Sequence, residues 1–194
     1  MPISFLGPYT RSILTAAIIV FGYLFYYSGI RADLYVSAEA LFIWSETTWF
    51  GVIGKTWGAA FAFVEAVHLL GLAVLGGCVI ASDGRLLGLM LTDFPARMVV
   101  DRSHRVFVWA LITCLVTGIF MACGVATKIY FLQVYWFKML ALVAGMLFHF
   151  FIRMPLLRHD LDEINPVVVK LVAISSILVW FTVAATGRWI GFSG

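Results

Sequence analysis

Residues 58–81 of the chain read GAAFAFVEAVHLLGLAVLGGCVIA, and Glu65 and His68 are the only strongly polar side chains in that run. A helix needs about 20 mostly apolar residues to cross the ~30 Å of hydrocarbon in a bilayer. The stretch therefore predicts a transmembrane helix.

Four more stretches are comparably apolar, at about residues 13–29, 106–126, 131–152 and 167–186. The first follows Arg11 as a signal peptide would, but no small-x-small cleavage site lies at its end, so we expect an uncleaved helix. Segment 32–57 mixes tryptophans with charged residues, which is typical of the headgroup layer, and predicts a short interfacial helix. The expected fold is an all-α integral membrane helical bundle with five transmembrane helices in one domain, residues 1–194.

The composition excludes several classes of protein. Hydrophobic residues make up 63% of the chain and charged residues 12%, against roughly 45–50% and about 25% in soluble domains. A soluble domain, a disordered tail and a nucleic-acid binder are therefore excluded. The three cysteines, Cys78, Cys114 and Cys123, lie in apolar runs, where we read them as small apolar side chains rather than a disulfide framework.

Basic residues set the expected orientation, because they concentrate in cytoplasmic loops. One side of the predicted bundle carries Arg11, Arg85, Arg97, Arg102, Arg105, Arg153, Arg158 and Lys170. The other side carries only Arg31, Lys55, Lys128 and Arg188. We therefore expect the N-terminus in the cytoplasm and the C-terminus in the periplasm or exterior.

Polar side chains inside the spans each cost at least ~2.5–3.5 kcal/mol at the bilayer centre, so each needs a partner or a task. Spacings of three and four residues place them on two helix faces. One face carries Glu65, His68 and Gly71, and the other carries Lys138, Leu142, Gly145 and His149. A glycine beside a histidine leaves room either for a large flat group or for a neighbouring helix.

Glu65 and Lys138 fall at matching depth on these two faces, with opposite charge, when each span is anchored by its flanking residues. We expect an ion pair between them. Such a pair either fixes the fold or serves a proton or substrate role, and the sequence leaves both open.

His68 and His149 suggest axial ligation of haem b, because haem iron takes imidazole and a helical bundle core accommodates the macrocycle. The helix rise places the two histidines about 10 Å apart in depth, so they share one iron only if the span boundaries shift. Structural histidines, hydrogen-bonded inside the bundle, are the alternative. His104 lies at the cytoplasmic mouth of its span, where we expect an interfacial residue.

The runs EAVHLLGLAVLGG (65–77), DGRLLG (83–88) and FKMLALVAG (137–145), with Phe148 and His149 after them, resemble a family of uncharacterised bacterial multi-pass membrane proteins. The resemblance covers about residues 48–158. More distantly, the histidine and the lysine–leucine–histidine pattern are similar to the membrane-bound haem b protoporphyrinogen oxidase and the copper-resistance membrane permease families. This likeness implies a four-helix haem-binding core, with His68 as the best ligand candidate and Lys138 as a second functional position.

The leading functional hypothesis is a b-type cytochrome of the bacterial inner membrane. It would pass electrons between quinone and a protein partner, alone, in an oligomer, or as the membrane subunit of a larger oxidoreductase. The alternatives are a porphyrinogen oxidase-like enzyme, a copper permease and a structural subunit without a cofactor. No methionine repeat of the kind that soft-ligand copper sites use is visible, which weighs against copper.

Overall fold

The computed structural model describes Val20, Leu24, Tyr27, Gly29–His159, Leu161 and Ile164–Ser193. These residues form helices and connections without a strand, which confirms the all-α prediction for this part of the chain. The chain divides into two compact units, Met1–Phe42 and Ile43–Gly194. The span expected at residues 13–29 lies almost wholly outside the described residues and stays a prediction.

Four helices of the second unit are long and apolar enough to cross a membrane: α4 (Gly58–Leu86), α5 (Ala96–Gly124), the helix Gln133–Leu157 that begins as α7, and α9 (Pro166–Ile190). They match four of the five predicted spans. Only 17–28% of the most apolar stretch of each helix is buried within the protein. Many large apolar side chains of these helices are exposed, among them Leu70, Val116, Leu140 and Leu178, and lipid rather than water suits them there.

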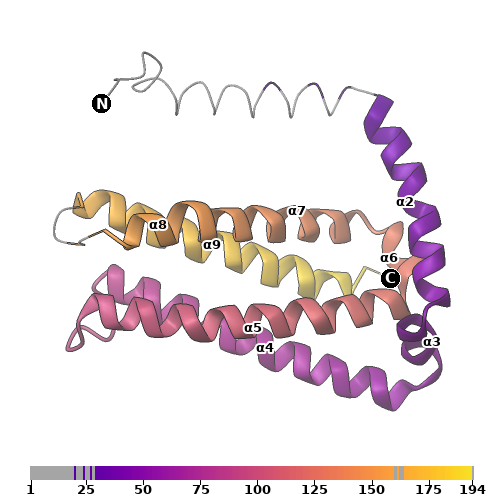
Figure 1. Ribbon diagram of the computed structural model, residues 1–194, viewed down its shortest axis with the longest axis horizontal. Coiled ribbons are helices and arrows are strands. Elements are labelled where there is room, and N and C mark those ends of the chain that lie inside the picture. Colours follow the sequence, from indigo (N-terminus) through magenta and orange to yellow (C-terminus); the bar gives the residue numbers. More distant parts are fainter. Residues whose placement is uncertain are drawn as a thin grey trace, which may run out of the picture. The chain divides into compact units, whose positions relative to one another are not determined.

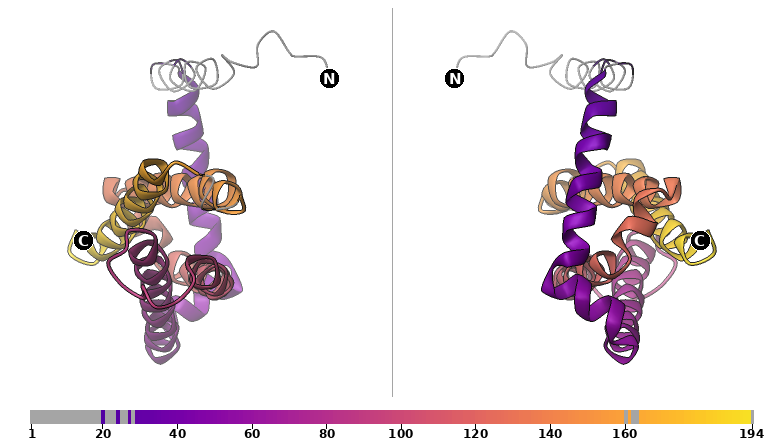
Figure 2. Two further views of the ribbon diagram at one scale, coloured as in Figure 1. Left: turned by 90° about the vertical axis from the view of Figure 1, so that its left-hand side faces the viewer. Right: turned by 90° about the vertical axis from the view of Figure 1, so that its right-hand side faces the viewer.

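The four long helices run up and down as antiparallel neighbours (Figure 1). Helix α4 packs along α5, α7 packs along α9, and α4 also contacts α9. The views along the bundle show the α7–α9 pair lying over the α4–α5 pair (Figure 2). The end of α4 and the starts of α5 and α9 lie at one end of the bundle, opposite the end where α3 and α6 lie.

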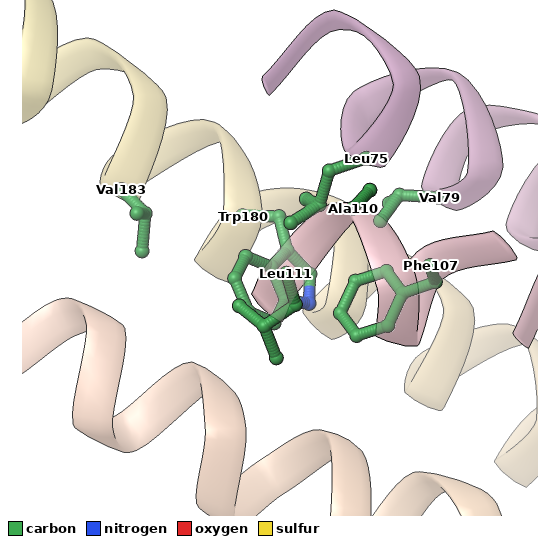
Figure 3. Close-up of a cluster of buried hydrophobic side chains, with 7 residues drawn as sticks. All are labelled: Leu75, Val79, Phe107, Ala110, Leu111, Trp180 and Val183. Carbon is green, nitrogen blue, oxygen red and sulfur yellow. The ribbon is translucent and has the colours of Figure 1, made fainter. Parts of the chain in front are cut away.

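The core lies where α4, α5 and α9 meet, and consists of Leu75, Val79, Phe107, Ala110, Leu111, Trp180 and Val183. Figure 3 shows Trp180 of α9 among side chains of α4 and α5. The Trp180 ring meets the Phe107 ring edge to face, with centroids 5.0 Å apart, a favourable aromatic geometry. This contact joins the two helix pairs.

The third span changes its helical type along its length. Helix α7 (Gln133–Leu147) runs into a π-helix, η2 (Phe148–Arg153), and then into α8 (Met154–Leu157). The wider π turn keeps His149 and Arg153 both inside the bundle, each 2% exposed. Single π turns of this kind often lie at functional sites.

The segment expected to form one short helix at 32–57 forms two, α2 (Gly29–Thr47) and α3 (Trp49–Thr56). Thr48 separates them, and its hydroxyl caps α3 by accepting a hydrogen bond from Gly51 N–H. Helix α3 packs on α5, where a Cβ on Gly54 would lie 2.9 Å from Gly124 Cα, so the two backbones nearly touch. A position of α3 in the headgroup layer stays a prediction.

Glu46 joins the end of α2 to α3 and to α6 (Ala126–Tyr130). It accepts hydrogen bonds from the Thr127 backbone N–H at 2.7 Å and hydroxyl at 2.6 Å, and it forms an ion pair with Lys55. Burial of the carboxylate opposes its ionisation, but the hydrogen bonds from Lys55 and Thr127 prevail and lower the pKa of Glu46 below its ordinary value of 4.5.

A lowered pKa in the folded state makes the contribution of Glu46 to stability depend on pH. The contribution is fully present above about pH 4.5, the ordinary value, and is lost as the pH falls through the lower folded value. Glu46→Gln should therefore lower the thermal melting temperature at pH 7, and the difference from wild type should shrink toward pH 3. A difference in melting temperature that stays constant between pH 7 and pH 3 would show that ionisation of Glu46 does not contribute to stability.

Candidate cofactor site

A cavity of about 310 Å³ lies between α4, α5, α7 and α9. This volume is at the lower end of the ~300–1,000 Å³ typical of small-molecule sites. Its walls are mostly apolar and include Leu75, Leu111 and Trp180 from the core. The polar or sulfur-bearing exceptions are His68, Cys114, Tyr135, Lys138 and Met139. An apolar chamber with a few polar groups is typical of a ligand site.

A hydrogen bond from another helix orients the ring of His68. Its Nδ1 lies 2.8 Å from the Thr117 hydroxyl, and that hydroxyl donates its single proton to the Thr113 carbonyl at 2.6 Å. With its proton on that carbonyl, the Thr117 hydroxyl accepts from His68, and this arrangement corresponds to the tautomer with the proton on Nδ1. The Nε2 lone pair is then left available, and it makes no hydrogen bond to any described residue. Fixing one ring nitrogen so that the other can bind is how proteins orient metal-ligating histidines.

Gly118 makes room for this ring. A Cβ at Gly118 would lie 3.3 Å from His68 Cε1, so a larger residue would push the imidazole out of position. Gly118 and Gly76 line the cavity. These two glycines, rather than those expected from the sequence, border the space for a ligand.

Lys138 lines the same cavity as His68. Its Cε and Nζ atoms lie 3.3 Å from the point that a Cβ on Gly187 would occupy, so the side chain rests against α9. No carboxylate among the described residues pairs with it. A lysine without a carboxylate partner beside an apolar chamber favours an anionic group on whatever binds there.

The expected ion pair between Glu65 and Lys138 does not form. The ion pairs recorded in the described part of the chain are Glu46–Lys55, Asp83–Arg153 and Arg97–Asp101. Glu65 is exposed on α4, whereas Lys138 extends toward α9. The matching depth of Glu65 and Lys138 in the membrane does not bring them into contact, because the two side chains project from their helices in different directions.

His149 does not share the cavity of His68. It lies in η2, where its Nε2 is 3.1 Å from His104 Nδ1 and its ring stacks on Phe107 with centroids 4.0 Å apart. The helix rise had indicated a difference in depth between the two histidines, and the structure places them in separate cavities. One iron bound by both is therefore incompatible with this arrangement.

Gly71 and Gly145 serve helix packing instead of leaving room for a cofactor. A Cβ on Gly71 would lie 2.9 Å from Cys114 Sγ of α5, and a Cβ on Gly145 would lie 3.0 Å from Val179 Cγ1 of α9. Neither glycine lines the large cavity. The close-packing interpretation of these residues is the correct one.

Reasoning from the sequence missed two pairs of interacting side chains, Asp83–Arg153 and His104–His149. Arg153 donates to Asp83 Oδ1 from Nη2 at 2.5 Å and from Nε at 3.1 Å, and to the Ser82 hydroxyl at 2.6 Å. Both charged side chains are almost fully buried, 3% and 0% exposed. His104, expected at the interface, is the hydrogen-bonding partner of His149. Asp83 and Arg153 lie just after the apolar runs 58–81 and 131–152, and their opposite charge was the available signal.

Comparison with known protein families assigns the chain to one of them. A model of a family of unknown function, DUF6644, matches residues 41–193. The chain belongs to this family. The match confirms the expected membership of an uncharacterised family and extends over all four long helices. No curated protein and no solved structure matches the chain.

The buried Asp83–Arg153 ion pair gives a direct test of the fold. Arg153→Met leaves the Asp83 carboxylate buried without its cation and should cost about 3–5 kcal/mol of unfolding free energy. The double variant Asp83→Leu/Arg153→Met removes both charges and should recover most of that loss. Reversible unfolding in mixed micelles measures the difference.

The matched control is the exposed pair Arg97–Asp101. Asp101→Asn removes one partner of a solvated pair and should change the stability by less than about 1 kcal/mol. Equal losses for Arg153→Met and Asp101→Asn would contradict the buried position of the pair.

Proposed function

We propose that this protein is a membrane-embedded b-type haem protein that carries electrons within the bilayer, with the haem in the large cavity. The observation that carries the proposal is the state of His68. Its Nδ1–H is fixed by Thr117, and its Nε2 is left unbonded at an apolar cavity between four helices. Neutral imidazole held in this way is the usual protein ligand of haem iron.

The residues of the cavity suit haem with one protein ligand. His68 would bind the iron, and the unpaired Lys138 would pair with a propionate. The apolar walls formed by Leu72, Leu142 and Phe181 would contact the macrocycle. His149 is not part of the proposed site, because its Nε2 is bonded to His104.

A bound haem would supply a reversible one-electron carrier. The chain's own residues set its surroundings: His68 donates electron density, Lys138 contributes positive charge, and the apolar walls exclude water. Positive charge and exclusion of water both tune the potential of a bound redox group. The electron donor and acceptor that suit this position are a quinone in the bilayer and a protein partner at its surface.

The same proposal includes the orientation of the bundle in the membrane. The end of the bundle that holds the starts of α5 and α9 carries Arg85, Arg97, Arg102, Arg105 and Arg158. This concentration supports a cytoplasmic position for that end in a bacterial inner membrane, with the C-terminus in the periplasm.

Copper is the second candidate ligand, because two soft donors line the same cavity as His68. These are the thiol of Cys114 and the thioether of Met139, which are ligand types that Cu(I) prefers. However, Cys114 Sγ lies 3.8 Å from the His68 carbonyl and against Gly71, at the α4–α5 contact. This position favours a packing role for the thiol, and haem remains the better fit.

Absorption spectroscopy of the purified protein, oxidised and then reduced with dithionite, tests the proposal. Wild type should show a Soret band and the visible bands of reduced haem b. His68→Gly should lose them, because the iron loses its protein ligand, and added imidazole should restore them. Restoration by imidazole shows that the variant is folded and that its cavity is intact.

His149→Gln is the matched control, because it changes another histidine within the membrane. It should keep the bands, since His149 lies outside the large cavity. Loss of the bands in His149→Gln but not in His68→Gly would contradict the proposed site. Metal analysis that finds copper without iron would favour the second candidate.

A further inference from the structure

A second and much smaller cavity lies where α4, α5, η2 and α9 meet. Its volume is about 10 Å³, close to the least space that one buried water requires. Its polar wall consists of Ser82, Ser103, His104, His149, Arg153 and Ser176. Since the large cavity is mostly apolar and this one is polar, the small cavity suits water better than an apolar ligand.

Among the described residues, four buried polar atoms have no hydrogen-bonding partner: Asp83 Oδ2, His149 Nδ1, Ser176 Oγ and Trp180 Nε1. Two of them belong to residues that line this cavity, His149 and Ser176. Ser176 faces the Asp83 carboxylate without a well-formed hydrogen bond, and it is only 1% exposed. Because buried polar groups nearly always have partners, these atoms require a donor or acceptor that the surrounding side chains do not supply.

The two histidines connect this cavity with the surface. His104 Nδ1 and His149 Nε2, 3.1 Å apart, share one proton between the two rings. Stacking on Phe107 fixes the ring of His149. His104 is half-buried and follows the exposed residues Asp101 and Arg102 on α5. Both rings line the small cavity, and His104 is the one closer to the exposed charged residues of α5.

The charged and titratable groups around the pair come from several elements. Asp83 of α4 and Arg153 of η2 form the buried ion pair, and Asp101 and Arg158 lie near His104. The thiol of Cys78 on α4 also lines the cavity, whereas α9 contributes only Ser176 to its wall. The positive charge of Arg153 acts on both histidine rings, and Asp83 is its counter-ion.

We propose that the small cavity binds one internal water and that this water extends the His104–His149 pair into a proton-transfer chain. A proton from the aqueous side binds His104 Nε2 while the Nδ1–H of that ring moves to His149 Nε2. The Nδ1–H of His149 moves to the water, which passes a proton on toward Ser176 and the Asp83 carboxylate. One proton enters the imidazole pair and one leaves it, and only N–H and O–H bonds change.

The small cavity adjoins the large one, because Val79 lines both. The water site and the histidine pair are independent of which ligand occupies the large cavity, so failure of the haem proposal would leave this one standing.

Nitrogen NMR of the full-length protein in lipid nanodiscs, with isotope-labelled histidine, tests the water site. Wild type should show a through-space signal between His149 Nδ1–H and a water that exchanges slowly with the bulk. Ser176→Val fills the cavity and should abolish this signal. Ser175→Val, one residue earlier on α9 and outside the cavity, should retain it. Absence of the signal in wild type overturns the proposal.

The exchange rate of His149 Nδ1–H with bulk water tests the transfer itself. His104→Phe keeps an aromatic ring in place but cannot carry a proton, so the rate should fall many-fold. His159→Phe, at an exposed histidine, should leave the rate unchanged. Equal rates in wild type and in His104→Phe would contradict the chain.

Discussion

The absence of water from hydrocarbon is the constraint on which the rest of this bundle depends. A polar side chain inside the membrane must find a partner in the protein or in a bound ligand. Asp83 and Arg153 satisfy this requirement with each other and join α4 to the third span. His68 satisfies it at only one of its ring nitrogens. The incompletely satisfied groups are therefore the ones that point to function.

The interior of the bundle contains two cavities of different character. The large cavity is apolar and offers His68 and Lys138 to a ligand. The small cavity is polar and lies beside the buried ion pair and the His104–His149 pair. Between them lies the aromatic contact of Phe107 with Trp180. A redox group in one chamber and a proton path in the other would suit chemistry in which electrons and protons move together.

The four long helices of the second unit could be predicted from the sequence, because the length of an apolar run alone decides whether it can cross a bilayer. The candidate His68 could also be predicted, since an imidazole within such a run needs a reason to be there. The residues that lie next to His68 in the folded protein could not be predicted. The partner Thr117 lies on another helix, and a threonine in an apolar helix carries no distinctive sequence signal.

The surroundings of His149 could not be predicted. A regular helix places His149 on one stripe with Gly145, and both lie near Trp180 of α9, but its partner His104 lies on another helix and its own segment is a π-helix. The π turn leaves no mark in the hydrophobic pattern. The Asp83–Arg153 pair could not be predicted either, because Arg153 was counted with the basic residues of the loops, whereas the structure buries both residues.

Native mass spectrometry of the protein released gently from membranes tests the central claim, that the large cavity is a ligand site. Wild type should carry a non-protein ligand. Leu142→Trp, which fills the cavity, should lose it, and Leu140→Trp, at an exposed position of the same helix, should keep it. A ligand retained equally by wild type and Leu142→Trp, or a wild type without any ligand, would contradict the account.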